Sequence, residues 1–356
     1  MKKRLMMVLL SFVMLIGTTA CGSKSETTKD SGKENSTSGE TAEDLPVLRV
    51  AMMPFVTSLP TYYIIENGLD VKAGFKLEYT MFQTGAPMSE ALAADLWDVG
   101  AMGAAAVTGV ANYDMMIVGE VLDSTDGLAV FVDDDSKIAR EKGYNPSYPN
   151  VLGSPDTVKD TTILLPVGTA QHFTALKWLE KLGLEGTDVN IVNMDSAQAY
   201  QAFQTDQGEA VALNIPTFFD AIEDGCVQAG NLADMGTMYV DMIVANRKAV
   251  ENNADLIQKY VDLVMEVNET LNADKEKAAE MMLEYSTREG IETTLETCQG
   301  DLERVDFITS EKWAEGRECG AFAKELGEFY IGLGQLEPDL LEKLDTNIDS
   351  QFVTQK

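Results

Sequence analysis

Strand-like and helix-like segments alternate along the chain from Val47 to about residue 245, and this alternation most constrains the fold. Residues 48–52 form a short apolar run typical of a buried strand, and residues 59–68 have the spacing of an amphipathic helix. Such alternation favours sheets covered by helices. After it, helices are predicted over residues 249–271, 275–285, 291–298 and 310–333. We therefore predict an α/β fold with a helical C-terminus.

Two similar blocks follow one another within this pattern. Each has a strand, a glycine-containing turn and a helix, with the turns at residues 83–86 and 167–170. A helix that begins after a strand directs unpaired backbone N–H groups toward the carboxyl end of the sheet, where crevices form. Two such blocks facing each other would enclose a ligand cleft.

The length of the chain favours two lobes, because about 310 residues after residue 45 exceed what one hydrophobic core comfortably supports. We predict lobe I over residues 46–126 and its return, with the C-terminal helices, over residues 243–356. Lobe II is predicted over residues 127–242. The two crossing segments would lie near residues 126–128 and 239–241, and closure about them would be the working motion.

The N-terminus has the pattern of a lipoprotein export signal. Three basic residues precede an apolar run at residues 5–16, which is too short to span a bilayer, and Gly-Thr-Thr-Ala-Cys follows at residues 17–21. We expect residues 1–20 to be removed, Cys21 to carry the lipid anchor, and residues 21–45 to form a flexible tether. The protein would then be held at the extracytoplasmic face of the cell membrane. The alternative is an ordinary secretory signal with a chance cysteine.

Charge and cysteine content exclude several classes of function. The formal net charge of −31 opposes binding to nucleic acid or to an anionic lipid surface. Cys298 and Cys319 could form a disulfide or remain free thiols, and Cys226 would be left over. A single histidine, His172, excludes a histidine-rich metal site. We expect a monomer with no metal and no cofactor.

Several short motifs occur in a recognisable order. They are Leu-Arg-Val-Ala at residues 48–51, Ala-Pro-Met-Ser-Glu-Ala-Leu at 86–92, Asp-Val-Gly at 98–100, Gly-Thr-Ala-Gln-His at 168–172 and Leu-Gly-Leu at 182–184. Their order resembles the substrate-binding proteins of ABC importers for nitrate, sulfonates and taurine, which share a fold with thiamine-pyrimidine binders and synthases. The resemblance implies a periplasmic-binding-protein fold of type II, a small-molecule ligand and a membrane permease as partner.

The resemblance also implies a cleft lined by the turns that follow strands. The candidate ligand-binding residues are Phe55, Gly85, Ala86, Gly103, Ala104, Thr169, Gln171, His172 and Asn214. Each has a structural alternative: Thr169 as a helix N-cap, His172 as a packing residue in the first helical turn, and Phe55 as part of the core. Where sulfonate binders tend to have an aromatic residue, this chain has Asn214.

The sequence leaves the charge of the ligand undetermined. No lysine or arginine falls within these turns, whereas acidic residues follow strands at Glu120, Asp123, Asp126, Asp195 and Asp241. A cationic or zwitterionic ligand is therefore more open here than the family resemblance suggests. Residues 133–159, with three prolines, are predicted to form a long surface loop that is a candidate lid or docking surface.

The leading hypothesis is a solute-binding component of an ABC importer that performs no chemistry. It would capture a sulfonate, taurine-like, nitrate-like or pyrimidine-like molecule for delivery to a permease. The rival from another class is an enzyme on the same fold, such as a pyrimidine synthase, which would need an activated lysine or a cysteine cluster. A third reading is a surface receptor without uptake.

Overall fold

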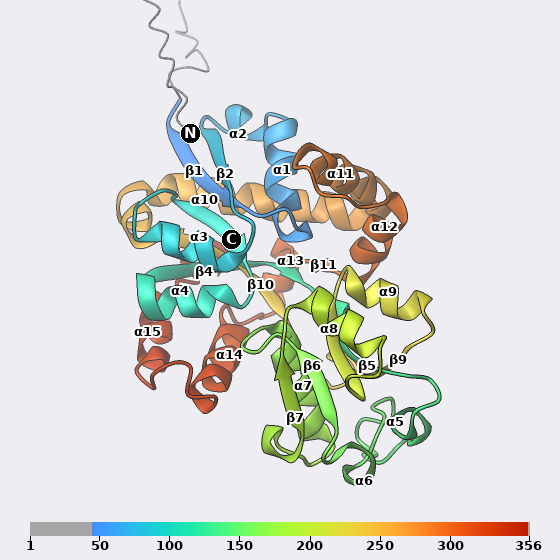
Figure 1. Cartoon of the computed structure of the whole chain (residues 1–356). Coiled ribbons are helices and arrows are strands. Elements are labelled where there is room, and N and C mark those ends of the chain that lie inside the picture. Colours follow the sequence, from blue (N-terminus) through green and yellow to red (C-terminus); the bar gives the residue numbers. More distant parts are fainter. Residues whose placement is uncertain (1–44, 355–356) are drawn as a thin grey trace, which may run out of the picture. The chain divides into compact units, whose positions relative to one another are not determined.

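The computed structural model describes residues 45–354, which contain two separate β-sheets (Figure 1). The first sheet has six strands in the order β11-β4-β10-β3-β1-β2. Its strands are β1 (Val47–Met52), β2 (Lys76–Met81), β3 (Val99–Met102), β4 (Met115–Asp123), β10 (Val240–Asn246) and β11 (Asp306–Phe307). The parallel pairs are β1 with β2 and β1 with β3, while β10 runs antiparallel between β3 and β4.

The second sheet has five strands in the order β7-β6-β8-β5-β9. Its strands are β5 (Leu128–Val132), β6 (Thr162–Leu165), β7 (Asn190–Asn193), β8 (Ala210–Asn214) and β9 (Val227–Asn231). Strand β6 pairs in parallel with β7 and β8, and β5 is antiparallel to β8 and β9. We refer to the six-stranded sheet with its helices as lobe I and to the five-stranded sheet with its helices as lobe II.

Helices cover both sheets. In lobe I they are α1 (Leu59–Glu66), α2 (Leu69–Lys72), α3 (Gly85–Leu92) and α4 (Ala105–Tyr113), with the short 3-10 turn η1 (Val56–Ser58). Around lobe II they are α5 (Lys137–Arg140), α6 (Pro155–Val158), α7 (Ala170–Lys181), α8 (Ser196–Phe203) and α9 (Thr217–Glu223), with the 3-10 turn η3 (Gly186–Asp188). The C-terminal helices are α10 (Arg247–Ala273), α11 (Lys275–Arg288), α12 (Leu295–Arg304), α13 (Ser310–Ala314), α14 (Ala321–Gly332), α15 (Leu340–Asn347) and α16 (Gln351–Thr354).

The chain crosses between the lobes twice within the alternating region. It leaves lobe I after β4, passes through the 3-10 turn η2 (Thr125–Gly127) and enters β5; it returns from β9 to β10. The predicted fold of two α/β lobes with two crossing segments and a helical C-terminus is thereby confirmed.

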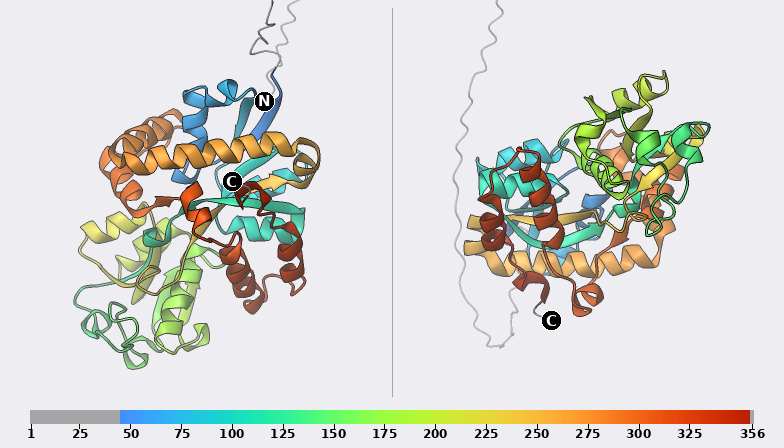
Figure 2. Two further views of the ribbon diagram at one scale, coloured as in Figure 1. Left: turned by 180° about the vertical axis from the view of Figure 1, so that it is seen from behind. Right: turned by 90° about the horizontal axis from the view of Figure 1, so that it is seen from below.

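The sheets form because their strands are almost continuously apolar. All four residues of β3 are buried, and so are the first eight residues of β4. Strands that are covered on both faces have this composition. The long helix α10 lies across the back of the lobe I sheet (Figure 2). Its buried Asn268 donates hydrogen bonds to the carbonyl oxygens of Val121 and Ile308, at 3.0 and 2.7 Å, which joins α10 to the sheet edge.

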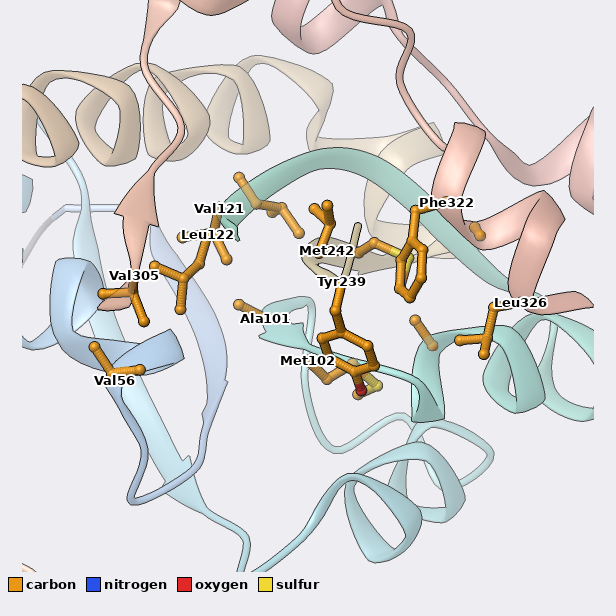
Figure 3. Packing of buried hydrophobic residues seen from close by; sticks show 14 of the residues in the cluster. Val56, Ala101, Met102, Val121, Leu122, Tyr239, Met242, Val305, Phe322 and Leu326 are labelled. Carbon is orange, nitrogen blue, oxygen red and sulfur yellow. The ribbon is translucent and has the colours of Figure 1, made fainter. Parts of the chain in front are cut away.

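Helix α14 lies against lobe II as well as lobe I. The rings of Phe173 in α7 and Phe329 in α14 have centroids 5.1 Å apart, and the Tyr330 hydroxyl donates to the Gly168 carbonyl over 3.1 Å. Phe322, at the start of α14, packs on Tyr239 of the second crossing segment with ring centroids 5.0 Å apart (Figure 3). A C-terminal helix therefore packs where the lobes meet.

The prediction of one helix over residues 310–333 is wrong. The chain forms α13 and α14 instead, separated by Gly316 and Gly320, whose φ values of 98° and 78° are left-handed and end or begin helices. Helix α12 begins at Leu295 and not at residue 291, because the Thr294 side chain accepts a hydrogen bond from the Thr297 N–H over 3.1 Å. Strands β9 and β11 and the helices after residue 334 were not predicted.

Residues 133–159 are more ordered than a simple loop. They contain α5 and α6 and an isolated antiparallel bridge between Lys142 and Leu152. Ile138 and Leu152 are buried, and the Trp178 indole N–H of α7 donates to the Leu152 carbonyl over 3.0 Å. The segment is thus packed onto α7 by its own apolar residues.

Cys226, Cys298 and Cys319 are free thiols, which settles the open disulfide question in favour of unpaired cysteines. Between residues 45 and 354 no helix is long and apolar enough to cross a membrane. The predicted signal segment, the Cys21 anchor and all but the last residue of the tether lie outside the described residues.

Candidate functional site

A cavity of about 290 Å³ lies where lobe I, lobe II and the two crossing segments meet. Residues of all four parts line it. The lining comprises Met53, Phe55, Val56, Thr57, Thr84, Gly85, Met102, Gly103, Ala104, Ala105, Ser124, Gly127, Leu128, Ala170, Asn214, Ile215, Tyr239, Asp241, Asp301 and Val305. Ligand sites of α/β proteins occupy this position, at the carboxyl ends of strands.

Lobe I lines the cavity with the turn after β1 and with the starts of α3 and α4. Neither Gly85 nor Gly103 has room for a side chain. A Cβ on Gly85 would lie 2.5 Å from the Ala105 Cβ, and one on Gly103 would lie 2.6 Å from Asp241 Oδ1. Both glycines are therefore required by close approach of neighbouring atoms.

Lobe II contributes the start of α7 and the end of β8. Gln171 Nε2 donates to Asn214 Oδ1 and to Ser196 Oγ, each over 2.7 Å. The Asn214 carboxamide oxygen is thereby occupied, and its N–H₂ group has no hydrogen-bond partner among the described residues. Asn214 thus offers a donor at the cavity wall, in an orientation that buried Gln171 holds.

The crossing segments are hydrogen-bonded to each other beside the cavity. The Ser124 N–H donates to the Tyr239 carbonyl over 3.0 Å, and the Tyr239 N–H donates to Thr125 Oγ1 over 2.8 Å. The Tyr239 hydroxyl accepts a hydrogen bond from the Ala104 N–H at 3.0 Å, which connects the second crossing segment to the start of α4. Figure 3 shows Tyr239 among the buried residues around Met102 and Phe322.

Two carboxyl groups line the cavity. Asp241, on β10, is 7% exposed and accepts a hydrogen bond from Thr57 Oγ1 at 2.5 Å. Burial raises the pKa of Asp241 to about 6, against the lowering effect of the Thr57 hydrogen bond, and Asp123 raises it further. Burial raises the pKa of Asp301, on α12, to about 7, with a further contribution from the charge of Asp241. Each group is therefore harder to ionise than a free aspartate.

The structure brings five of the nine predicted ligand-binding residues to the cavity wall: Phe55, Gly85, Gly103, Ala104 and Asn214. Phe55 is 48% exposed, so its ring lies at the cavity rim with a free face. The other four, Ala86, Thr169, Gln171 and His172, do not line the cavity. Gln171 reaches it indirectly, through its hydrogen bond to Asn214.

His172 and Thr169 support the turn before α7. His172 Nδ1 accepts a hydrogen bond from the Gly168 N–H over 3.1 Å, and the imidazole packs against Phe329 with ring centroids 5.8 Å apart. Burial lowers the pKa of His172 below its usual value, which agrees with a neutral ring. Thr169 Oγ1 donates to the Pro166 carbonyl over 2.6 Å and thus closes the same turn.

The acidic residues predicted to follow strands have different positions, and Glu120 and Asp241 lie within β4 and β10. Glu120 pairs with Arg317 in a buried ion pair (Oε2 to Nε, 2.5 Å), and Asp126 pairs with Arg304 (Oδ2 to Nη1, 2.9 Å). The others are Asp123, which accepts hydrogen bonds from Thr125, Asp195, which precedes α8, and Asp241 in the cavity.

Sequence reasoning missed Asp301 and left Asp241 outside the predicted site. Asp241 stands near the start of an apolar strand, Val-Asp-Met-Ile-Val-Ala, where a carboxylate is out of place. Asp301 falls one residue before the buried Leu302 and three after the buried Cys298 in α12. An acidic residue beside an apolar face was the available signal in both cases.

No group of histidine, cysteine or carboxylate side chains within residues 45–354 could hold a metal ion. Helices α3, α4 and α7 all begin at the cavity wall, and their N-terminal N–H groups favour a polar or anionic ligand group. The cavity therefore combines hydrogen-bond donors, two carboxyl groups and an apolar wall.

Comparison with known proteins gives relatives and structural neighbours. A protein of Brachyspira hyodysenteriae, named as an ABC transporter periplasmic binding protein, is 36% identical over 321 residues, which cover 90% of this chain and 91% of the relative. The periplasmic aliphatic sulphonate binding protein SsuA of Escherichia coli is similar in structure with a TM-score of 0.66 at 17% identity, covering 83% of this chain and 91% of the other.

The alkanesulfonate-binding protein SsuA of Xanthomonas axonopodis pv. citri, bound to MOPS, gives a TM-score of 0.61 at 16% identity and covers 85% of this chain and 98% of the other. At these identities the two structures show a shared fold. The sequence match of residues 41–284 extends over more than half of the chain, so this protein belongs to the NMT1-like family.

Proposed function

We propose that this protein is the extracytoplasmic solute-binding component of an ABC importer, which captures a small organic molecule and delivers it to a membrane permease. The observation that carries this proposal is the cavity of about 290 Å³ lined by both lobes and both crossing segments. A ligand in such a cavity contacts both lobes at once, so its binding would favour their closure. The named function of the Brachyspira relative supports the same role.

The composition of the cavity wall supports binding without chemistry. Its described residues include no lysine, cysteine or histidine. A mechanism that uses a lysine or cysteine nucleophile or a histidine base therefore has no such group on this wall. The imidazole of His172 is occupied by the turn before α7 and does not reach the wall. The rival role of a pyrimidine synthase would need an activated lysine or a cysteine cluster, and neither lysine nor cysteine is among the described lining residues.

We propose two roles for the nine candidate residues. Phe55, Gly85, Gly103, Ala104 and Asn214 contact the ligand directly. A second group, Ala86, Thr169, Gln171 and His172, shapes the helix starts and holds the side chains that make contact. We also propose that acylated Cys21 anchors the protein at the membrane, where the permease is found.

The direct test is a ligand screen by thermal shift on the tag-free mature protein, with sulfonates, aminosulfonates, nitrate, aromatic acids, amines and pyrimidines. Compounds that raise Tm are then measured by isothermal titration calorimetry and recovered for mass spectrometry. We expect at least one compound to bind and to be recovered unchanged. Conversion of a bound compound would favour the enzyme, and an absence of binding to the whole panel would contradict the proposal.

A matched pair of variants tests the site. Asn214→Leu removes the amide donor at nearly constant volume, and we expect binding to weaken about two- to tenfold for the loss of one hydrogen bond. The control is Asn252→Leu, on the exposed face of α10, where the side chain only donates to the Lys248 carbonyl. Equal affinities of the two variants would place the site elsewhere.

Delivery to a permease needs a separate test. Deletion of the gene from its host is expected to reduce uptake of an isotopically labelled form of the bound compound, and restoration of the gene is expected to recover it. Unchanged uptake with intact binding would favour a receptor without transport.

A further inference from the structure

The two carboxyl groups of the cavity, Asp241 and Asp301, come from different elements, yet each lines the same space. Asp241 stands on β10 at the second crossing segment, and Asp301 stands on α12. Among the described residues no lysine or arginine side chain lines the cavity with them. The cavity therefore has negative groups on its wall with no protein cation to balance them.

The hydrogen bonds of these carboxyl groups are incomplete. Asp241 Oδ2 accepts from Thr57, while Oδ1 has no hydrogen-bond donor among the described residues. The Oδ1 atom lies against Gly103, since a Cβ built on residue 103 would come within 2.6 Å of it. Asp241 is thus a side chain more than nine-tenths buried that has one oxygen free at the cavity.

Asp301 makes no side-chain hydrogen bond or ion pair within residues 45–354. Arg304, the nearest basic residue along α12, interacts with other groups. Its Nη1 lies 2.9 Å from Asp126 Oδ2, and its guanidinium lies over the ring of Phe218, 5.1 Å from the centroid. Arg304 therefore holds the first crossing segment and lobe II and leaves Asp301 unpaired.

Two unpaired carboxyl groups in a partly enclosed, largely apolar cavity are costly to ionise, because each is removed from water and each repels the other. A cation placed between them would offset both effects. The remaining wall is mainly apolar, with Met53, Val56, Met102, Leu128, Ile215 and Val305. This lining suits an organic cation with an apolar body better than a hydrated metal ion.

We infer that the ligand of this protein carries a protonated amine, which binds between Asp241 and Asp301 with its apolar body against the surrounding wall. This inference rests on the proposed solute-binding function and names its substrate class. It goes beyond the sulfonate group for which the structural neighbours are named. The Asn214 amide and the N–H groups at the starts of α3, α4 and α7 are then available to bind a second polar group of the same ligand.

The test uses pairs of compounds that differ only in an amine or a hydroxyl group. The pairs are 2-aminoethanesulfonate with 2-hydroxyethanesulfonate, 5-aminopentanoate with 5-hydroxypentanoate, and benzylamine with benzyl alcohol. Affinities are measured by calorimetry on the mature wild-type protein at pH 7.5. We expect the amine of at least one pair to bind tenfold or more tightly than its hydroxyl partner.

Three variants locate the effect. Asp301→Asn and Asp241→Asn keep the side-chain shape and remove the charge, and each is expected to reduce the amine-to-hydroxyl affinity ratio about tenfold or more. Asp156→Asn removes the charge of an exposed carboxylate on α6, away from the cavity wall, and is expected to leave the ratio unchanged. The ratio separates loss of charge recognition from a general change in stability.

The outcomes are distinguishable. A hydroxyl or purely anionic compound that binds as tightly as its amine partner, or a ratio that Asp301→Asn and Asp241→Asn leave unchanged, overturns the inference and leaves the proposed function standing. An equal reduction of the amine-to-hydroxyl affinity ratio in Asp156→Asn also overturns the inference, because the reduction would then follow from the change in net charge. A protein that binds no compound of this set or of the wider screen contradicts both.

Discussion

The backbone N–H of Tyr239 donates a hydrogen bond of 2.8 Å to the side-chain oxygen of Thr125, and this bond joins the two segments that cross between the lobes. A second hydrogen bond joins the same segments, from the Ser124 N–H to the Tyr239 carbonyl. Because Ser124 and Tyr239 also line the cavity, the joint between the segments and the proposed ligand site share residues. A ligand that contacts these residues therefore acts directly on the joint.

The first prediction concerns this joint. Thr125→Val removes the acceptor for the Tyr239 N–H and the hydroxyl that donates to Asp123, and is expected to lower the free energy of unfolding by about 1–2 kcal/mol. Urea denaturation measures the change. The matched control is Thr270→Val on the exposed face of α10, which is expected to lower the free energy of unfolding by less. Equal losses in the two variants would mean that the Thr125 bond adds no stability.

The second prediction concerns the motion of the lobes. A ligand that contacts both lobes is expected to draw them together, so the radius of gyration from small-angle X-ray scattering should fall when the protein is saturated with a compound found in the screen. The radius of gyration of Asn214→Leu should fall less at the same compound concentration. Identical radii with and without saturating compound would contradict closure on binding.

The third prediction concerns pH. The pKa of Asp301 is raised to about 7 in the folded protein, well above that of an unfolded aspartate, so the folded state binds a proton more tightly. The protonated carboxyl contributes stability at pH 5, and this contribution is lost as the pH rises through about 7. Asp301→Asn should therefore be more stable than the wild type at pH 8, and this advantage should shrink by about 1–3 kcal/mol between pH 8 and pH 5.

Thermal unfolding of both proteins across this pH range measures the difference. Asp156→Asn, which removes the charge of an exposed carboxylate on α6, is the control and should show no comparable gain in stability at pH 8. A difference between wild type and Asp301→Asn that does not change between pH 5 and pH 8 would show that the Asp301 side chain is not titrating there.

The fourth prediction concerns His172, the one histidine of the chain. Burial lowers the pKa of its imidazole, so its ring signals should titrate with a midpoint below that of a free histidine. Two-dimensional NMR of the tag-free protein gives one set of ring signals and needs no assignment. A bound ligand that reorders the turn before α7 should shift them. A midpoint at or above 6.5 would contradict the buried, neutral ring.

The fifth prediction concerns attachment to the membrane. If Cys21 carries the lipid, Cys21→Ala should release the protein into the soluble fraction or leave it unprocessed, because the only long apolar run of the sequence precedes it. Cell fractionation with mass spectrometry of the N-terminus measures both. A Cys21→Ala protein that is processed and still bound to the membrane would contradict the lipoprotein interpretation.

The alternation of segments in the sequence determined the fold class. Apolar runs such as β3 and β4 and the helical spacing of α7 are local patterns, and each becomes the element expected of it. Local signals failed where a short element depends on a distant partner. Strand β11 has two residues and exists because Asp306 and Phe307 pair with Asp123 and Leu122 of β4.

For the site, the sequence by itself determined the positions of the turns that line the cavity, since a glycine or small residue between a strand and a helix marks Gly85, Gly103 and Ala104. Only the tertiary structure decided which side chains share the space. Asp241 and Asp301 are 60 positions apart and meet because α12 packs near the first crossing segment. Their proximity depends on packing between elements, whereas sequence periodicity reports only which face of a single element is buried.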